Sequence, residues 1–191
     1  MLDSILAKRN CSLKVKLTVK GIATLVAIAL AVALPELFHA LGSVTNMGTA
    51  LGETFLPMHI AVFMVGLIAG PAAGLITGLA APAISFGLSG MPTVVMLPYM
   101  MIELATYGAV SGLLANVKMP CILKLLTAQV AGRGLRAIAI VIGAYAFGSP
   151  VNVAVIWTSI VAGLPGLILQ WIIIPLLMFW ISKKVSEHEG R

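Results

Sequence analysis

The sequence predicts an all-α integral membrane protein, a bundle of about six transmembrane helices with its N- and C-termini in the cytoplasm. Of its 191 residues, 60% are hydrophobic and only 9% are charged, and the mean hydropathy is +1.09. A water-soluble domain cannot bury that much apolar surface. Because a helix needs about 20 residues to cross a bilayer, the chain has room for about six crossings and little else.

The third observation is the placement of the basic residues, which gather in residues 8–20, 118–124 and 183–191. Six crossings put these three segments on one side, and cytoplasmic loops are enriched in Lys and Arg. The formal charge of +6 therefore indicates membrane topology rather than nucleic-acid binding. We expect a multi-pass protein of the plasma membrane with a cytoplasmic arm, a six-helix transmembrane domain and a cytoplasmic tail, over residues 1–16, 17–181 and 182–191.

The first two crossings flank a long polar connection. Residues 17–38 form an apolar run of span length, and "ALGSVTNMGTALGET" after it has the small and polar residues of an external connection. The second crossing, residues 55–69, is short, which suggests tilt or extension by the residues before it. Gly70 and Pro71 then mark a tight cytoplasmic turn.

The other four crossings are bounded by Gly and Pro. "SGMP" ends the third and starts the fourth, where Pro92 suits a first helical turn. "KMP" closes the fourth on the inside, and "GSP" closes the fifth on the outside. These crossings cover residues 72–88, 93–116, 122–147 and 151–181. Five crossings with a re-entrant segment is the main alternative, because the second and third are the weakest.

Small residues recur at helical spacing in two places. Gly66, Gly70, Gly74 and Gly78 favour close packing between helices, because packing contacts drive helix association in lipid. Ala23, Ala27 and Ala31 also share one face, since four residues advance a helix by about 400°. Spacing alone favours packing within the chain over docking of a separate subunit.

Three ionisable residues lie deep in the predicted crossings: Glu103, Arg133 and Arg136. A lone charge there costs about 2.5–3.5 kcal/mol on insertion scales, so each needs water, a partner or a ligand. We favour an ion pair of Glu103 with one arginine, and direct contact with a ligand is the alternative.

A second polar set lies toward the predicted outer half. Singly, such aromatic and polar residues are common anchors at the membrane interface. Together they predict an outward-facing pocket for a small molecule. The set consists of Glu53, His59, Tyr99, Tyr145, Asn152 and Trp157. One His and one Glu in this stretch make a weak case for a metal.

Several energy-coupling and catalytic patterns are absent from the sequence. It has no G-x-x-x-x-G-K-[ST] loop, no H-E-x-x-H and a single aspartate, Asp3. We therefore do not expect an enzyme or an ion-coupled pump, and energy for uphill transport must come from elsewhere. Cys11 and Cys121 both lie in predicted cytoplasmic segments, which predicts free thiols.

"LGETFLPMHIAVFMVGLIAGPAAGLITGLAAPAISFGLSGMP" followed by "MMIELATYGAVSGLL" resembles the S components of energy-coupling factor (ECF) transporters, the vitamin-specific membrane subunits of that ABC class. The resemblance covers most of the chain. It implies a six-helix bundle that captures a vitamin or vitamin precursor from outside. A transmembrane coupling subunit (T component) and two cytoplasmic ATPases would then use ATP to topple it in the bilayer, and the chain itself would bind no cofactor.

The resemblance also implies two sets of functional residues. The small-residue face of the first crossing contacts the coupling subunit in this family, which maps to Ala23, Ala27 and Ala31. The ligand lies near the outer side, and its expected contacts here are Glu53, His59, Tyr99, Glu103, Arg133, Asn152 and Trp157. Glu53 and His59 would form the lid, and Arg133 either contacts ligand or pairs with Glu103.

One short motif bears on the transported compound. The FLPMH pattern is similar to members assigned to cobalamin or its benzimidazole precursor, which we favour, and to pyridoxine or pantothenate, which are the alternatives. An aromatic content of 6% argues against a large stacked flavin cage. An alternative of another class is a stand-alone facilitator or channel for small molecules.

Overall fold

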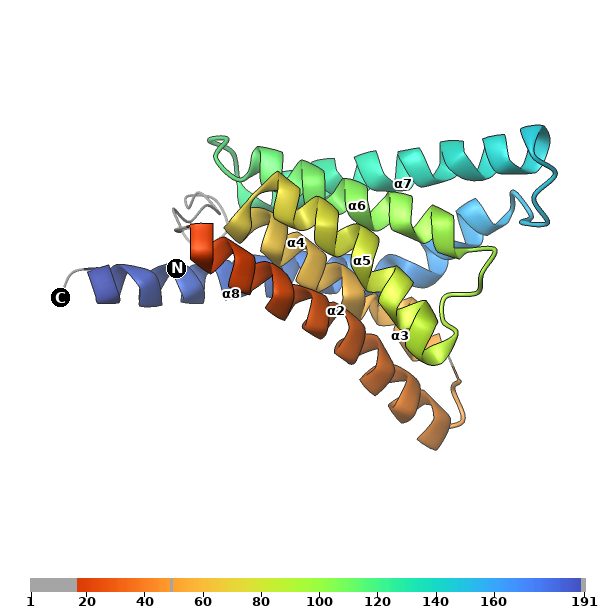
Figure 1. The fold of residues 1–191 in the computed structure, drawn as a ribbon, viewed down its shortest axis with the longest axis horizontal. Coiled ribbons are helices and arrows are strands. Elements are labelled where there is room, and N and C mark those ends of the chain that lie inside the picture. The colour runs from red at the N-terminus through yellow and green to blue at the C-terminus, as the bar shows by residue number, and fades with distance from the viewer. Residues whose placement is uncertain (1–16, 49, 190–191) are drawn as a thin grey trace.

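The computed structural model describes residues 17–48 and 50–189, and this part of the chain is helical with no strand in it (Figure 1). Its helices are α2 (Leu17–Val44), α3 (Ala50–Phe55), α4 (Pro57–Ala69), α5 (Pro71–Ser89), α6 (Leu97–Leu114), α7 (Cys121–Ala146) and α8 (Val155–Glu189).

Five segments within the described residues are long and apolar enough to cross a membrane: Leu17–Val44, Ala50–Ala69, Pro71–Ser89, Cys121–Ala146 and Val155–Val185. The predicted class of an all-helical, multi-pass membrane protein is therefore confirmed. Helix α6 is not among the five, because its 18 residues include the polar side chains of Glu103, Tyr99 and Tyr107.

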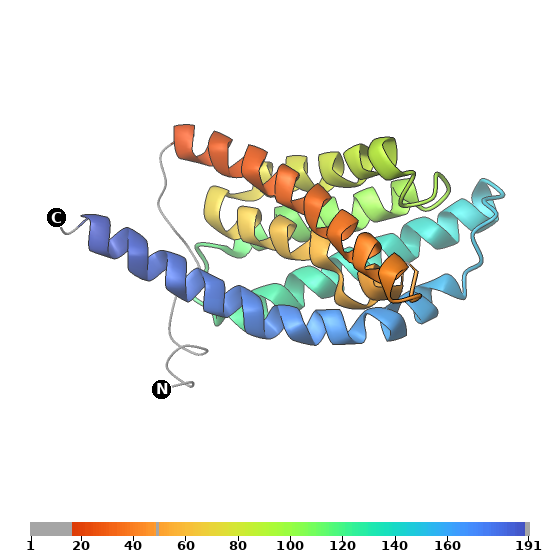
Figure 2. The same cartoon turned by 90° about the horizontal axis from the view of Figure 1, so that it is seen from below.

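Each predicted crossing corresponds to a helix, but several boundaries differ. Helix α2 continues to Val44, and the connection after it contains the short helix α3, so ten of the 15 residues of the predicted loop are helical. Helices α6 and α8 begin later than predicted, at Leu97 and Val155. Helix α8 continues to Glu189 through most of the predicted tail and extends beyond the other helices (Figure 2). The predicted arm, residues 1–16, lies outside the described residues.

Gly and Pro end the helices where the sequence predicted turns. Gly70, at φ 97°, separates α4 from α5, and Gly90, at φ 72°, ends α5. Both conformations are accessible to glycine without the clash that a Cβ brings. Leu56 also has a positive φ of 49°, which is rare for a bulky residue. It joins α3 to α4, and Pro57 then starts α4.

The chain runs back and forth, so that the start of α2 and the end of α8 lie at the same end of the bundle (Figures 1 and 2). The α6–α7 connection lies at this end too, whereas the α5–α6 and α7–α8 connections lie at the other. Every lysine in the described ranges is close to the first end: Lys20, Lys118, Lys124, Lys183 and Lys184. The lysines of the described ranges therefore gather at one end of the bundle.

Helix α6 packs directly against α4, α5 and α7. A Cβ on Gly74 would overlap the backbone of Gly108, and one on Gly78 would overlap the backbone of Leu104. The predicted role in close helix packing is confirmed for Gly66, Gly74 and Gly78, whereas a Cβ on Gly70 would meet nothing within 4 Å. Because its neighbours approach this closely, α6 buries Glu103 and Tyr107 inside the bundle.

The alanine row of α2 packs within the chain. Ala27 lies in a cluster with Val65, Ala69 and Ala73, against which half-buried Ala23 packs. Ala31 is 0% exposed. The row therefore faces α4 and α5, and the expectation of an exposed docking face at Ala23, Ala27 and Ala31 is wrong for the two buried members. Small-residue spacing marks close approach between helices, which neighbours in the same chain satisfy as well as a partner does.

Cys121 is buried and disulfide-bonded, so the prediction of a free thiol is wrong for this residue. That prediction used the redox state of the compartment, which carries no information on whether the fold brings sulfur atoms together. Cys11 lies outside the described residues.

We expect Gly74→Ala to lower the thermal unfolding midpoint of the detergent-solubilised protein by several degrees. The new methyl group must push α5 away from Gly108, and overpacking of this kind typically costs about 1–3 kcal/mol. Gly87→Ala is the matched control, because it lies on the same helix and a Cβ there meets nothing within 4 Å. Equal midpoints for the two variants would show that the α5–α6 contact is not tight.

Candidate functional site

A cavity of about 430 Å³ opens near the end of the bundle that carries the α5–α6 and α7–α8 connections. Its volume lies within the range of about 300–1,000 Å³ that is usual for small-molecule sites. Helices α2 to α8 all contribute to its wall. The lining residues with ionisable side chains are His39, Glu53, His59, Glu103, Arg133 and Arg136.

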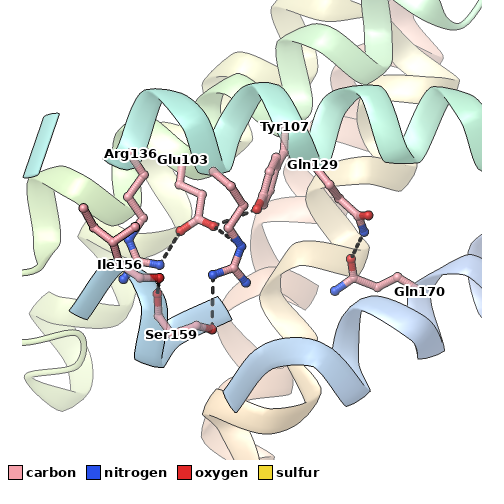
Figure 3. Close-up of polar contacts among 8 residues, drawn as sticks. Glu103, Tyr107, Gln129, Arg136, Ile156, Ser159 and Gln170 are labelled. Atoms are coloured by element: carbon pink, nitrogen blue, oxygen red, sulfur yellow. Dashed lines mark hydrogen bonds and ion pairs between the residues drawn. The ribbon is translucent and has the colours of Figure 1, made fainter. Parts of the chain in front are cut away.

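Glu103 is the most buried charged group of this wall, at 1% exposed. Tyr107 donates its hydroxyl hydrogen bond to Oε1 at 2.7 Å, and Arg136 Nη1 donates to Oε2 at 2.8 Å (Figure 3). Arg133 Nε lies 3.1 Å from Oε1. One carboxylate is therefore held by two guanidinium groups and a phenol, which offsets the cost of burying its charge.

Local sequence explains how these groups meet. Glu103 and Tyr107 are four residues apart on α6, and Arg133 and Arg136 are three apart on α7, so each pair shares one helix face. Between the two faces lies Gly132, where a Cβ would overlap the Tyr107 ring. Glycine at this position lets α7 approach α6 closely enough for the ion pairs to form.

Arg133 also connects α7 to α8. Its Nη1 donates a hydrogen bond to the backbone carbonyl of Ser159 at 3.2 Å. A Cβ on Gly163 would lie 3.0 Å from Arg133 Nη2, so the missing side chain leaves room for the guanidinium group. Arg133 is thus anchored between the carboxylate of Glu103 and the backbone of α8.

His59 lies on the same wall, from α4, and is 3% exposed. Its ring centroid lies 5.3 Å from that of Tyr107. Neither ring nitrogen has a hydrogen-bond partner. A buried imidazole without partners is costly, because it has lost water and gained nothing in return.

Four of the predicted ligand contacts line the cavity, namely Glu53, His59, Glu103 and Arg133. Glu103 and Arg133 are also paired, as the sequence favoured, but Glu103 pairs with both arginines rather than one. Glu53 is exposed at the mouth of the cavity. The structure brings these four together from α3, α4, α6 and α7.

The other three predicted contacts lie outside the cavity wall. Tyr99 donates a hydrogen bond to Ser149 Oγ at 3.0 Å, and Asn152 Oδ1 accepts one from the Ala154 backbone at 2.8 Å. Trp157 is 70% exposed. The α8 residues that do line the cavity are Val155, Thr158, Ser159 and Ala162. Their spacing defines one helix face, and Trp157 points away from it.

Several lining residues were not predicted. Arg136 was recognised as a deep charge but was not assigned to the site, and His39 was given no role. The wall also contains four methionines, Met58, Met91, Met96 and Met100. Met96 and Met100 are spaced by one helical turn, which is the only local signal that they share a face. Methionine adapts its shape readily and suits a wall that fits a ligand.

The described residues contain no group of three or more His, Cys, Asp or Glu side chains placed to hold a metal ion. Comparisons with protein-family models, with curated proteins and with solved structures find no match to this chain. The function is therefore argued from the cavity and the groups around it.

We expect Glu103→Gln to destabilise the protein by about 3–5 kcal/mol, the usual cost of removing one partner of a buried ion pair. The substitution leaves two buried guanidinium groups without a counter-charge. Thermal unfolding of the purified protein measures the effect. Glu53→Gln is the control, because an exposed carboxylate contributes about 0–1 kcal/mol.

Adding Arg136→Gln to Glu103→Gln should recover part of that loss, because only one uncompensated cation then remains. The double-mutant cycle measures this coupling directly. Strictly additive effects of the two substitutions would contradict the ion pair.

Proposed function

We propose that the chain is the substrate-specific binding subunit of an ECF-type ABC importer, and that it captures a vitamin or vitamin precursor from outside the cell. The observation that carries this proposal is the cavity with a charged floor, at one end of a bundle of membrane helices. A cavity of 430 Å³ that combines flexible apolar walls with a few converging polar groups has the composition of a small-molecule site.

In the proposed topology six segments cross the plasma membrane, namely the five long apolar segments and helix α6. Helix α6 is surrounded by α4, α5 and α7, so its charged residue faces protein instead of lipid, which a membrane helix can tolerate. The lysines at one end of the bundle support a cytoplasmic location for both termini. The cavity then opens near the outer surface.

The proposal assigns energy coupling to partners, namely a T component and two cytoplasmic ATPases that use ATP to topple the subunit. The deep carboxylate of this chain, Glu103, is bound by two arginines. A carboxylate held in this way is poorly suited to relay protons. We do not place the coupling-subunit contact on Ala27 and Ala31, because both are buried.

The cavity size bears on the candidate compounds. Cobalamin is far larger than the drug-sized molecules that sites of this volume enclose. Its benzimidazole precursor, pyridoxine and pantothenate are all small enough for 430 Å³. Cavity volume therefore favours the precursor over cobalamin itself.

Binding is tested by titrating these compounds into the purified chain after extraction of any retained molecule. Ala162→Trp fills the cavity and should weaken binding of the retained compound at least tenfold. Val161→Trp is the matched control. Val161 is the residue next to Ala162, its side chain is 49% exposed, and it is not part of the cavity wall. Equal affinities of the two variants would place the ligand elsewhere.

Transport is tested in liposomes that contain this chain alone. We expect the compound to bind without accumulating or equilibrating across the bilayer, until the T component and ATPases are added with ATP. Flux through the isolated chain would instead support a facilitator or channel.

A further inference from the structure

We propose that the ligand of this cavity is a small organic acid with a single carboxylate, which binds the two guanidinium groups of Arg133 and Arg136. This inference rests on the proposed function, because it names the chemical class of the compound that the subunit would capture.

The first argument is the charge balance of the buried wall. The side chains of Arg133 and Arg136 are only 13% and 14% exposed, and the side chain of Glu103, which lies between them, is 2% exposed. Glu53 is the other carboxylate of the wall, but it is exposed at the mouth, where water screens its charge. The buried part therefore holds two cations and one anion. An excess positive charge away from water is costly, and a single anionic group removes the excess.

The second argument is the supply of unused hydrogen-bonding atoms around the cavity. Arg133 and Arg136 each carry five N–H groups, yet each makes one hydrogen bond in the structure, to Ser159 and Glu103 respectively. Arg133 Nε is close enough to Glu103 for an ion pair but is not aligned for a hydrogen bond.

The buried polar atoms without a hydrogen-bond partner are concentrated in this wall. In the described residues they include Nε of both arginines, both ring nitrogens of His59 and Nδ1 of His39. Guanidinium groups donate only, so a ligand must bring acceptors to them. A carboxylate brings two oxygens in the planar arrangement that matches an arginine fork.

The remaining wall limits what else the ligand carries. Met91, Pro92, Met96 and Met100 are apolar or weakly polar, and they suit an uncharged body. A cationic ligand would add a third positive charge to the floor. A dianion would exceed the single charge that is uncompensated. His59 offers one donor and one acceptor, which suits a hydroxyl or amide on that body.

The experiment uses the full chain, purified in lipid nanodiscs. Molecules released from it are treated with a methyl-esterifying reagent and identified by mass spectrometry, and we expect one methyl ester per molecule. Matched probes then separate charge from shape: pantothenate against pantothenol, and nicotinate against nicotinamide. We expect an acid to bind at least tenfold more tightly than its neutral counterpart.

Arg136→Gln should weaken binding of that acid at least tenfold. This variant is expected to fold, because Glu103 keeps its ion pair with Arg133, and thermal unfolding checks this. Arg136→Lys keeps the charge but loses the planar fork, so its affinity should lie between those of the wild type and Arg136→Gln. Val130→Ala is the control with unchanged affinity, because this side chain of the same helix is 72% exposed and is not part of the cavity wall.

The inference is overturned if the released molecule has no acid group, if a neutral probe binds as tightly as its acid, or if Arg136→Gln leaves the affinity for the acid unchanged. In each of these cases the proposed function survives, because a small molecule is still bound. If no molecule is retained and neither acids nor neutral probes bind at millimolar concentration, the proposed function fails as well.

Discussion

The ion network of Glu103 with Arg133 and Arg136 is the constraint on which the rest of the structure depends. In a bundle of membrane-spanning helices, three charged groups persist only where protein surrounds them and where each finds a partner. Glu103 Oε2 lies 2.8 Å from Arg136 Nη1, and Arg133 continues the network to the backbone of α8. The network therefore sets the relative positions of α6, α7 and α8 around the cavity.

Glycines of α5 and α7 allow the close packing that surrounds this ion network. Contacts of Gly74 with Gly108 and of Gly78 with Leu104 bring α5 onto the backbone of α6, and Gly132 brings α7 onto Tyr107. Close approach on these sides excludes both lipid and water from the carboxylate. The cavity lies on the side of the network where Arg133 and Arg136 form part of its wall. Two arginines and one buried glutamate meet there, so the positive charges outnumber the negative one.

Much of this arrangement could be predicted from the sequence. Apolar runs of span length between Gly and Pro turns locate the helices, and the cost of a lone charge in a membrane predicts that Glu103 pairs with an arginine. The sequence did not predict which neighbour each face of a helix contacts. Trp157 points outward and Ser159, two residues later, lines the cavity, because contacts with α3, α4 and α7 determine how α8 is rotated. The alanine row shows the same limit, since its spacing reports close approach and not the identity of the neighbour. Helix α3 was missed because Gly and Thr in residues 50–55 resemble a loop, and its packing against α8 outweighs their low helix propensity.

An experimental structure of the chain as purified from cells, in lipid nanodiscs, tests the central claim most directly. That claim is that a small molecule binds in the cavity above the ion network. We expect density for a compact molecule within hydrogen-bond distance of Arg133 and Arg136, with Glu103 still paired. A cavity closed by its own methionine side chains, or a molecule bound elsewhere on the bundle, would contradict it.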